Sequence, residues 1–178
     1  MGRRFSESFL GALKGSLLML AQIRITISQQ QLTLTDEQGK THQWLVSTAA
    51  NGVGSRQGSG CTPLGRHQIK IKIGESAPEN AVFVGRRATG EIYSPELAAA
   101  EPQRDWILTR ILWLSGLESG VNRGGDVDTL RRYIYIHGTP DSEPMGIPKS
   151  HGCVRMRNAD LLELFDKVSP GTLVDIVN

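Results

Sequence analysis

The feature that most constrains the fold is an alternation of apolar and polar residues near the start of the chain. Ile23, Ile25 and Ile27 are separated by polar residues, and Leu32 and Leu34 continue the pattern after a glutamine-rich break. A period of two places apolar side chains on one face of a β-strand, whereas a helix needs them three and four positions apart. The stretch therefore predicts half-buried strands and a fold built on a sheet.

The same pattern recurs later in the chain. Residues 41–48, 67–73 and 173–177 are predicted as further strands. Residues 159–168 carry an apolar stripe at helical spacing, which predicts one helix with Asn158 as its N-cap. The expected fold class is mainly β, a sandwich-like sheet pair with one supporting helix.

Residues 82–132 fit this pattern least well and are predicted to form an irregular α/β insert. Residues 95–101 predict a helical turn. Residues 106–114 are apolar enough for a buried strand, although their spacing fits a helix nearly as well.

A candidate active site lies in residues 136–156, which read IHGTPDSEPMGIPKSHGCVRM. A cysteine becomes a nucleophile when an imidazole or backbone N–H groups stabilise its thiolate. Cys153 is therefore predicted to be the nucleophile, with His137, at the end of a strand-like run, as its partner. Gly152 has no Cβ, so a substrate carbonyl can approach closely and have its oxyanion bound by the N–H groups of Gly152 and Cys153. This arrangement suits acyl transfer.

These residues resemble the signature of a known family, the L,D-transpeptidase or YkuD-type catalytic domain. The signature is a His-Gly pair followed by Ser/Thr-His-Gly-Cys, which corresponds here to residues 137–139 and 150–156. Other matches follow in the family's order, at residues 23–35, 46–48, 62–65 and 170–174. The resemblance implies that residues 23–178 form one catalytic domain with a YkuD-like β-sandwich, and with an insert at about 82–132.

The resemblance also implies a cysteine acyltransferase that acts on peptidoglycan stem peptides. In this family, the cysteine attacks the L,D bond before the terminal D-alanine of a tetrapeptide and forms an acyl-enzyme. An amine acceptor then gives a cross-link, and water gives a tripeptide. Catalytic roles are implied for Cys153, for His137 as the base that forms an ion pair with it, for His151, which shapes the pocket, and for Gly152. The residues predicted to bind substrate are Gly138, Thr139, Ser150 and Arg155.

Three other interpretations compete with this one. Cysteine is most often a small buried hydrophobe, although the polar Ser-His-Gly context of Cys153 argues against that role. A zinc site formed by His137, His151 and Cys153 would also give a hydrolase, but no fourth ligand motif is evident, and neither a metal nor a cofactor is expected. A non-catalytic wall-binding domain would not need the nucleophile, the base and Gly152 together.

Composition bears on the partners. The length of 178 residues suits one domain. The formal net charge of +2 is too small for nucleic-acid binding, and the pairs Arg86-Arg87 and Arg131-Arg132 are predicted to be solvated. The expected partner is a peptidoglycan tetrapeptide or muropeptide, and some basic residues could bind its carboxylates. The only other cysteine, Cys61, is predicted to be a reduced thiol near the site.

Residues 1–22 bear on the compartment. They begin like a secretory signal, but Lys14 leaves only residues 17–21 as an uninterrupted apolar run. That run is shorter than the roughly 7–15 residues of a signal core and the roughly 20 of a membrane span. Residues 1–22 are therefore predicted to be a leader or an upstream extension, without stable membrane insertion. A cytoplasmic location is favoured over a periplasmic one, and with it an L,D-carboxypeptidase of murein recycling over a cross-linking transpeptidase. The oligomeric state stays open.

Overall fold

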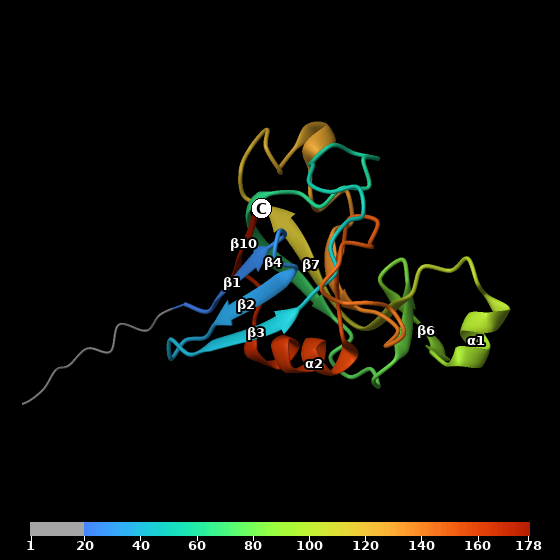
Figure 1. The fold of residues 1–178 in the computed structure, drawn as a ribbon. Helices are drawn as coiled ribbons and strands as arrows, with labels where there is room; N and C mark the ends of the chain where they lie inside the picture. Colours follow the sequence, from blue (N-terminus) through green and yellow to red (C-terminus); the bar gives the residue numbers. More distant parts are fainter. Residues whose placement is uncertain (1–19) are drawn as a thin grey trace, which may run out of the picture.

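The computed structural model describes residues 20–178, so residues 1–19 of the predicted leader lie outside the described part (Figure 1). In chain order, the elements are β1 (Gln22–Thr26), β2 (Gln31–Thr35), β3 (Thr41–Leu45), β4 (Gly65–Ile73), β5 (Ala81–Val84), β6 (Arg87–Ile92), α1 (Pro95–Ala100), β7 (Ile107–Gly116), the short 3-10 helix η1 (Gly125–Val127), β8 (Tyr135–Gly138), β9 (Val154–Met156), α2 (Asn158–Lys167) and β10 (Leu173–Val177).

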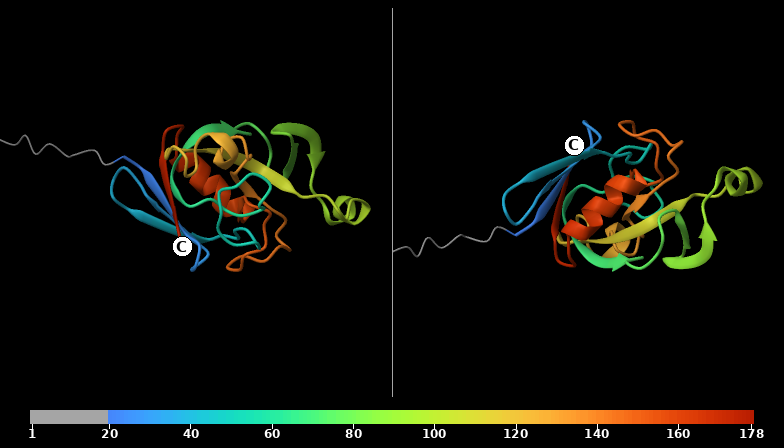
Figure 2. Two further views of the ribbon diagram at one scale, coloured as in Figure 1. Left: turned by 90° about the horizontal axis from the view of Figure 1, so that it is seen from above. Right: turned by 90° about the horizontal axis from the view of Figure 1, so that it is seen from below.

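The ten strands belong to one hydrogen-bonded sheet. Its main order is β3-β2-β1-β10-β4-β7-β5-β6, while β8 pairs with β7 and carries β9. Most neighbouring strands are antiparallel, but β1 pairs in parallel with β10 and β8 in parallel with β9. The sheet curls, and Figure 2 shows its strands arranged around α2, with α1 projecting away from them. The mainly β class is confirmed, and the strands expected to form a sheet pair are hydrogen-bonded into this single curled sheet.

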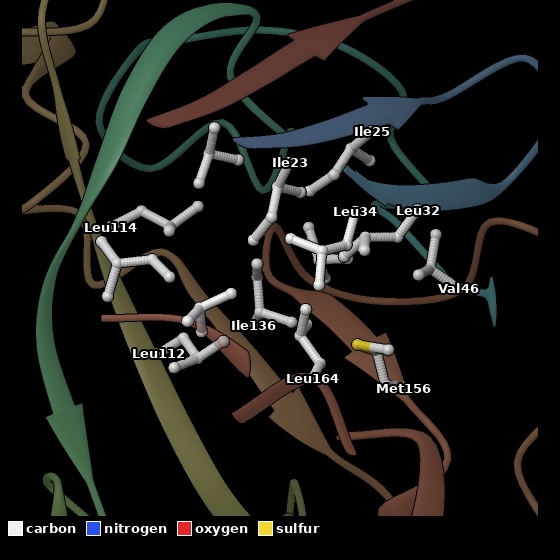
Figure 3. Close-up of a cluster of buried hydrophobic side chains, with 14 of the residues drawn as sticks. Ile23, Ile25, Leu32, Leu34, Val46, Leu112, Leu114, Ile136, Met156 and Leu164 are labelled. Carbon is white, nitrogen blue, oxygen red and sulfur yellow. The ribbon is translucent and has the colours of Figure 1, made fainter. Parts of the chain in front are cut away.

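The main hydrophobic core lies between the curled sheet and α2. Figure 3 shows side chains from β1, β2, β7, β8 and β9 meeting Leu164 of α2. Ile23, Ile25, Leu32 and Leu34 all face this core and are at most 1% exposed. The predicted half-buried strands are therefore confirmed, because one face of β1 and β2 is removed from water. Burial of apolar surface contributes roughly 25 cal/mol per Å² to folding.

The predicted helix is present, but its N-terminus differs from the prediction. α2 begins at Asn158, and the capping position is Arg157, whose side chain makes no capping hydrogen bond. Asn158 is buried and bonds elsewhere, since its Oδ1 accepts from Thr109 Oγ1 at 2.7 Å and its Nδ2 donates to the carbonyl of Thr139 at 3.1 Å. The prediction that Asn158 caps the helix was wrong, because its side chain links α2 to β7 and to the end of β8.

The segment 82–132 is partly peripheral and partly central. It contains the β5–β6 hairpin at one end of the sheet and the projecting helix α1 (Figure 1). It also contains β7, which pairs with β4, β5 and β8. The strand alternative for residues 106–114 is therefore confirmed, and β7 is the element against which the His137 strand is aligned.

In the part of the chain that the structure describes, neither α1 nor α2 has the length and apolar character needed to cross a bilayer.

Replacement of Leu164 tests the role of α2 in the core. Leu164 is fully buried, so Leu164→Ala should lower the free energy of unfolding by about 2–5 kcal/mol through lost burial and a residual cavity. Asp166→Ala, on the exposed side of the same helix, should change it by no more than about 0.5 kcal/mol. Chemical denaturation followed by circular dichroism measures both, and equal losses would show that α2 is not packed as described.

Candidate active site

Cys153 lies directly before β9, and its sulfur rests against the backbone that leads into β8. The N–H of Tyr135 donates to Sγ at 3.3 Å, and the thiol donates to the carbonyl of Tyr133 at 3.4 Å. The side chain is half-buried and lines a cavity of about 270 Å³. An N–H group directed at sulfur stabilises a thiolate, so this contact is suited to a nucleophile.

His137 lines the same cavity from β8. It is only 1% exposed, and its Nδ1 lies 2.7 Å from the carbonyl of Gly138. A carbonyl only accepts, so Nδ1 carries the proton and Nε2 is left with a free lone pair. The ring is therefore held in the tautomer that can take a proton from a thiol.

The register of two parallel strands fixes the surroundings of His137. Residue His137 of β8 is aligned with Arg155 of β9. The guanidinium of Arg155 is buried and donates to Asp105 Oδ1 at 2.8 Å. The exposed ring of His151 lies 3.6 Å from the other oxygen of Asp105. Arg155 and His151, both singled out from the sequence, thus meet at one carboxylate beside the cavity.

Burial changes the proton affinity of the two reactive groups. It lowers the pKa of His137 to about 4 and raises the pKa of the Cys153 thiol to about 12. The Tyr135 N–H and the charges of Arg155 and Arg132 lower the thiol pKa, but each does so less than burial raises it. Both shifts favour the neutral form of each group at rest, while the ion pair that the family resemblance implies stays a prediction.

The loop before Cys153 is fixed from behind. Ser150 is buried, donates through Oγ to the carbonyl of Cys153 and accepts the N–H of Gly152 at 3.3 Å. Thr62 Oγ1 donates to the carbonyl of Gly152 at 2.9 Å. Among residues 20–178, none accepts the N–H of Cys153. Of the two predicted oxyanion donors, the Cys153 N–H is the unoccupied one.

Two residues predicted to bind substrate have structural contacts. A Cβ at Gly138 would collide with the Asn158 side chain and lie 2.7 Å from the carbonyl of Leu108, so only glycine fits there. Thr139 is buried, and its carbonyl accepts from Asn158. Thr139 also lines a second cavity of about 270 Å³, which shares Asp105, His151 and Arg155 with the first. The substrate roles of Gly138, Thr139, Ser150 and Arg155 stay predictions.

Sequence reasoning missed three charged residues of the site. Asp105 lies in none of the sequence motifs, and only the fold brings it to Arg155. Arg132 was expected to be solvated, but its guanidinium donates to the carbonyls of Gly54 and Cys61 and lines the Cys153 cavity. Arg86 was also expected to be solvated, yet it lines the same cavity. The expectation was wrong for Arg132, whose guanidinium is bonded to protein oxygens. Arg86 is half-buried and keeps part of its side chain exposed.

The zinc alternative requires His137, His151 and Cys153 to converge. His137 is buried, whereas the His151 side chain is 79% exposed and turns to Asp105. Among residues 20–178, no three His, Cys, Asp or Glu side chains form a group that could hold a metal ion. The residues present therefore do not provide that site.

The family model described as the L,D-transpeptidase catalytic domain, YkuD, matches residues 21–176. The chain belongs to this family. It is 45% identical over 125 residues to the probable L,D-transpeptidase ErfK/SrfK of Salmonella typhimurium strain LT2, which covers 65% of this chain and 40% of that protein. It is 47% identical over 47 residues to the probable L,D-transpeptidase YbiS of Escherichia coli K12, which covers 26% of this chain and 15% of that protein. The chain thus spans less than half the length of these curated relatives.

Solved structures of L,D-transpeptidases share the fold. L,D-transpeptidase 3 from Mycobacterium tuberculosis, in complex with a faropenem-derived adduct, matches with a TM-score of 0.55 and 15% identity, over 89% of this chain and 60% of that one. LdtMt1 in complex with imipenem matches with a TM-score of 0.50 and 17% identity, over 88% and 58%. At such identities the likeness concerns the fold, and it confirms the YkuD-like architecture.

Alkylation by iodoacetamide tests whether the resting thiol is neutral. Only the thiolate reacts, and the pKa of Cys153 is raised to about 12, so the rate constant should rise about tenfold per pH unit between about pH 7 and about pH 9. Cys61→Ser leaves Cys153 as the only thiol, and mass spectrometry follows the adduct. A rate that does not change over this range would reveal a resting thiolate and contradict the neutral pair.

Proposed function

We propose that this L,D-transpeptidase domain transfers an acyl group from a peptidoglycan stem peptide through Cys153. The donor is a tetrapeptide that is cleaved at the L,D bond before its terminal D-alanine. The observation that carries the proposal is the shared cavity of Cys153 and His137, in which a backbone N–H points at the sulfur and the imidazole keeps a free lone pair. Cysteine acyl transfer needs these two features.

The reaction runs in two steps. His137 Nε2 takes the thiol proton while Sγ attacks the scissile carbonyl, and the N–H of Cys153 stabilises the oxyanion. The intermediate collapses when the C–N bond breaks, and His137 gives its proton to the amine of the departing D-alanine. The acceptor then loses a proton to His137 as it attacks the thioester, the C–S bond breaks, and His137 returns that proton to the sulfur.

The choice of acceptor divides two candidate functions. An amine acceptor is favoured by the second cavity, which adjoins the nucleophile's cavity at Asp105 and Arg155 and has a similar volume of about 270 Å³. A second peptide needs such a space, whereas water does not. Hydrolysis, the acceptor favoured from the sequence, is supported by the partial exposure of Cys153, which admits water to the thioester. We place transfer to an amine first.

The compartment stays a prediction, and it depends on which acceptor the enzyme uses. Hydrolysis of recycled, soluble tetrapeptides suits the cytoplasm, and cross-linking or exchange of D-amino acids suits the periplasm. The same product analysis therefore bears on both.

Product analysis by mass spectrometry tests the function. The protein is incubated with disaccharide-tetrapeptide, with and without a D-amino acid as acceptor. Exchanged or cross-linked product is expected when the acceptor is present, and tripeptide alone in its presence would favour the carboxypeptidase. Cys153→Ala should lose at least about 10³-fold in rate, because the nucleophile is gone. Cys61→Ser is the matched control and should keep its activity; activity retained by Cys153→Ala would refute the mechanism.

Reaction with imipenem provides an independent test of the nucleophile. A β-lactam carbonyl is an acyl donor, so one imipenem should add covalently to Cys153 and raise the intact mass accordingly. The adduct should form on Cys61→Ser and be absent from Cys153→Ala. An adduct on Cys61 alone would show that Cys61 is the reactive thiol and would contradict the role proposed for Cys153.

A further inference from the structure

Arg86 occupies a backbone conformation that its side chain does not favour. It is the second residue of the two-residue turn between β5 and β6, and both turn residues have positive φ, +54° at Gly85 and +68° at Arg86. Hairpin turns of this kind prefer asparagine or glycine, because few other residues adopt the left-handed region readily. An arginine at this place therefore calls for a reason other than turn stability.

The guanidinium of Arg86 is held in the nucleophile's cavity by aromatic rings. It lies 4.8 Å from the centre of the Trp113 ring and 4.6 Å from that of Tyr133, and its Nη1 donates to the hydroxyl of Tyr135 at 3.2 Å. Tyr133 and Tyr135 are the residues whose backbone contacts the sulfur of Cys153. The position of the positive charge is thus tied to the position of the nucleophile.

Arg86 differs from the other two arginines of this cavity. Arg155 pairs with Asp105, and the guanidinium of Arg132 is bonded to protein oxygens. Within residues 20–178, no carboxylate lies within ion-pair distance of Arg86, and its one hydrogen bond there goes to the Tyr135 hydroxyl. Most of its five N–H donors are therefore available to a ligand.

We propose that Arg86 is a specificity residue that binds a carboxylate of the donor peptide while its scissile carbonyl lies at Cys153. The proposal rests on the proposed function and names the part of the substrate that is read. A planar guanidinium can donate two parallel hydrogen bonds to a carboxylate. Because stacking on two rings already restricts the Arg86 side chain, less conformational entropy is lost when the ligand binds. Two carboxylates of the donor fit this chemistry. One is that of the terminal D-alanine, and the other is on the side chain of the third residue where this is diaminopimelate, as the family resemblance implies for many stem peptides.

Equilibrium binding to the Cys153→Ala protein tests the proposal without turnover. Isothermal titration calorimetry compares the tetrapeptide with two variants, one amidated at the terminal D-alanine and one amidated at the third-residue side chain. The free acid should bind about 10- to 100-fold more tightly than one of the amides, as expected for a hydrogen-bonded charge pair. The amide that loses affinity identifies the carboxylate that Arg86 reads.

Arg86→Gln in the same background should remove this discrimination. Its affinity for the free acid should fall to that of the discriminated amide, while its affinity for that amide stays unchanged. Arg86→Asn should behave alike, and asparagine suits the positive φ, so the hairpin is retained. Arg87→Gln, at the exposed next position, is the matched control and should discriminate as the parent does.

The outcomes separate this proposal from the function on which it rests. Binding of all three peptides with equal affinity, or discrimination that persists in Arg86→Gln and Arg86→Asn, would overturn the role of Arg86 and leave the acyl-transfer proposal standing. No binding of any of the three peptides, together with no product from the active protein, would overturn both. Thermal unfolding of each variant shows that the comparison concerns folded protein.

Discussion

The parallel pairing of β8 with β9 is the constraint on which the site depends. It involves only three residue pairs, yet it aligns His137 with Arg155 and brings the sulfur of Cys153 onto the backbone of Tyr133 and Tyr135. Neither strand could hold this register alone. On one side β7 pairs with β8, and on the other the backbone of Ser47 bonds with Arg155 in both directions. The β8–β9 pairing is therefore held from both sides, by β7 and by the backbone of Ser47.

The same burial that fixes the site also sets its charge. It favours the neutral forms of His137, which is buried, and of Cys153, which is half-buried. Asp105 and Arg155 act in opposite directions on the thiol, since the carboxylate raises its pKa and the guanidinium lowers it. While these two are paired, their effects on Cys153 offset each other.

How much the sequence predicts depends on the range of the interaction. Strands follow from the local alternation, and the roles proposed for His137 and Cys153 follow from residue types at a short spacing. The position of Asn158 before a helical stripe also had a local meaning, but its side chain bonds to Thr109, forty-nine residues away, and no local pattern contains that contact. The site positions of Asp105 and Arg86 were not predicted for the same reason, because the register of the sheet brings their neighbours to them.

The two kinds of site residue come from different parts of the chain, and this division has a chemical consequence. His137, Cys153 and the proposed oxyanion donor belong to the strands and loop of residues 136–156, where a small displacement would separate them. Arg86 and Asp105 come from segment 82–132, in the turn of an edge hairpin and in the connection before β7. Changes in these connections can alter which substrate groups are bound while β8 and β9 keep their register. The proposed reaction chemistry and the proposed substrate recognition thus lie on different elements of one sheet.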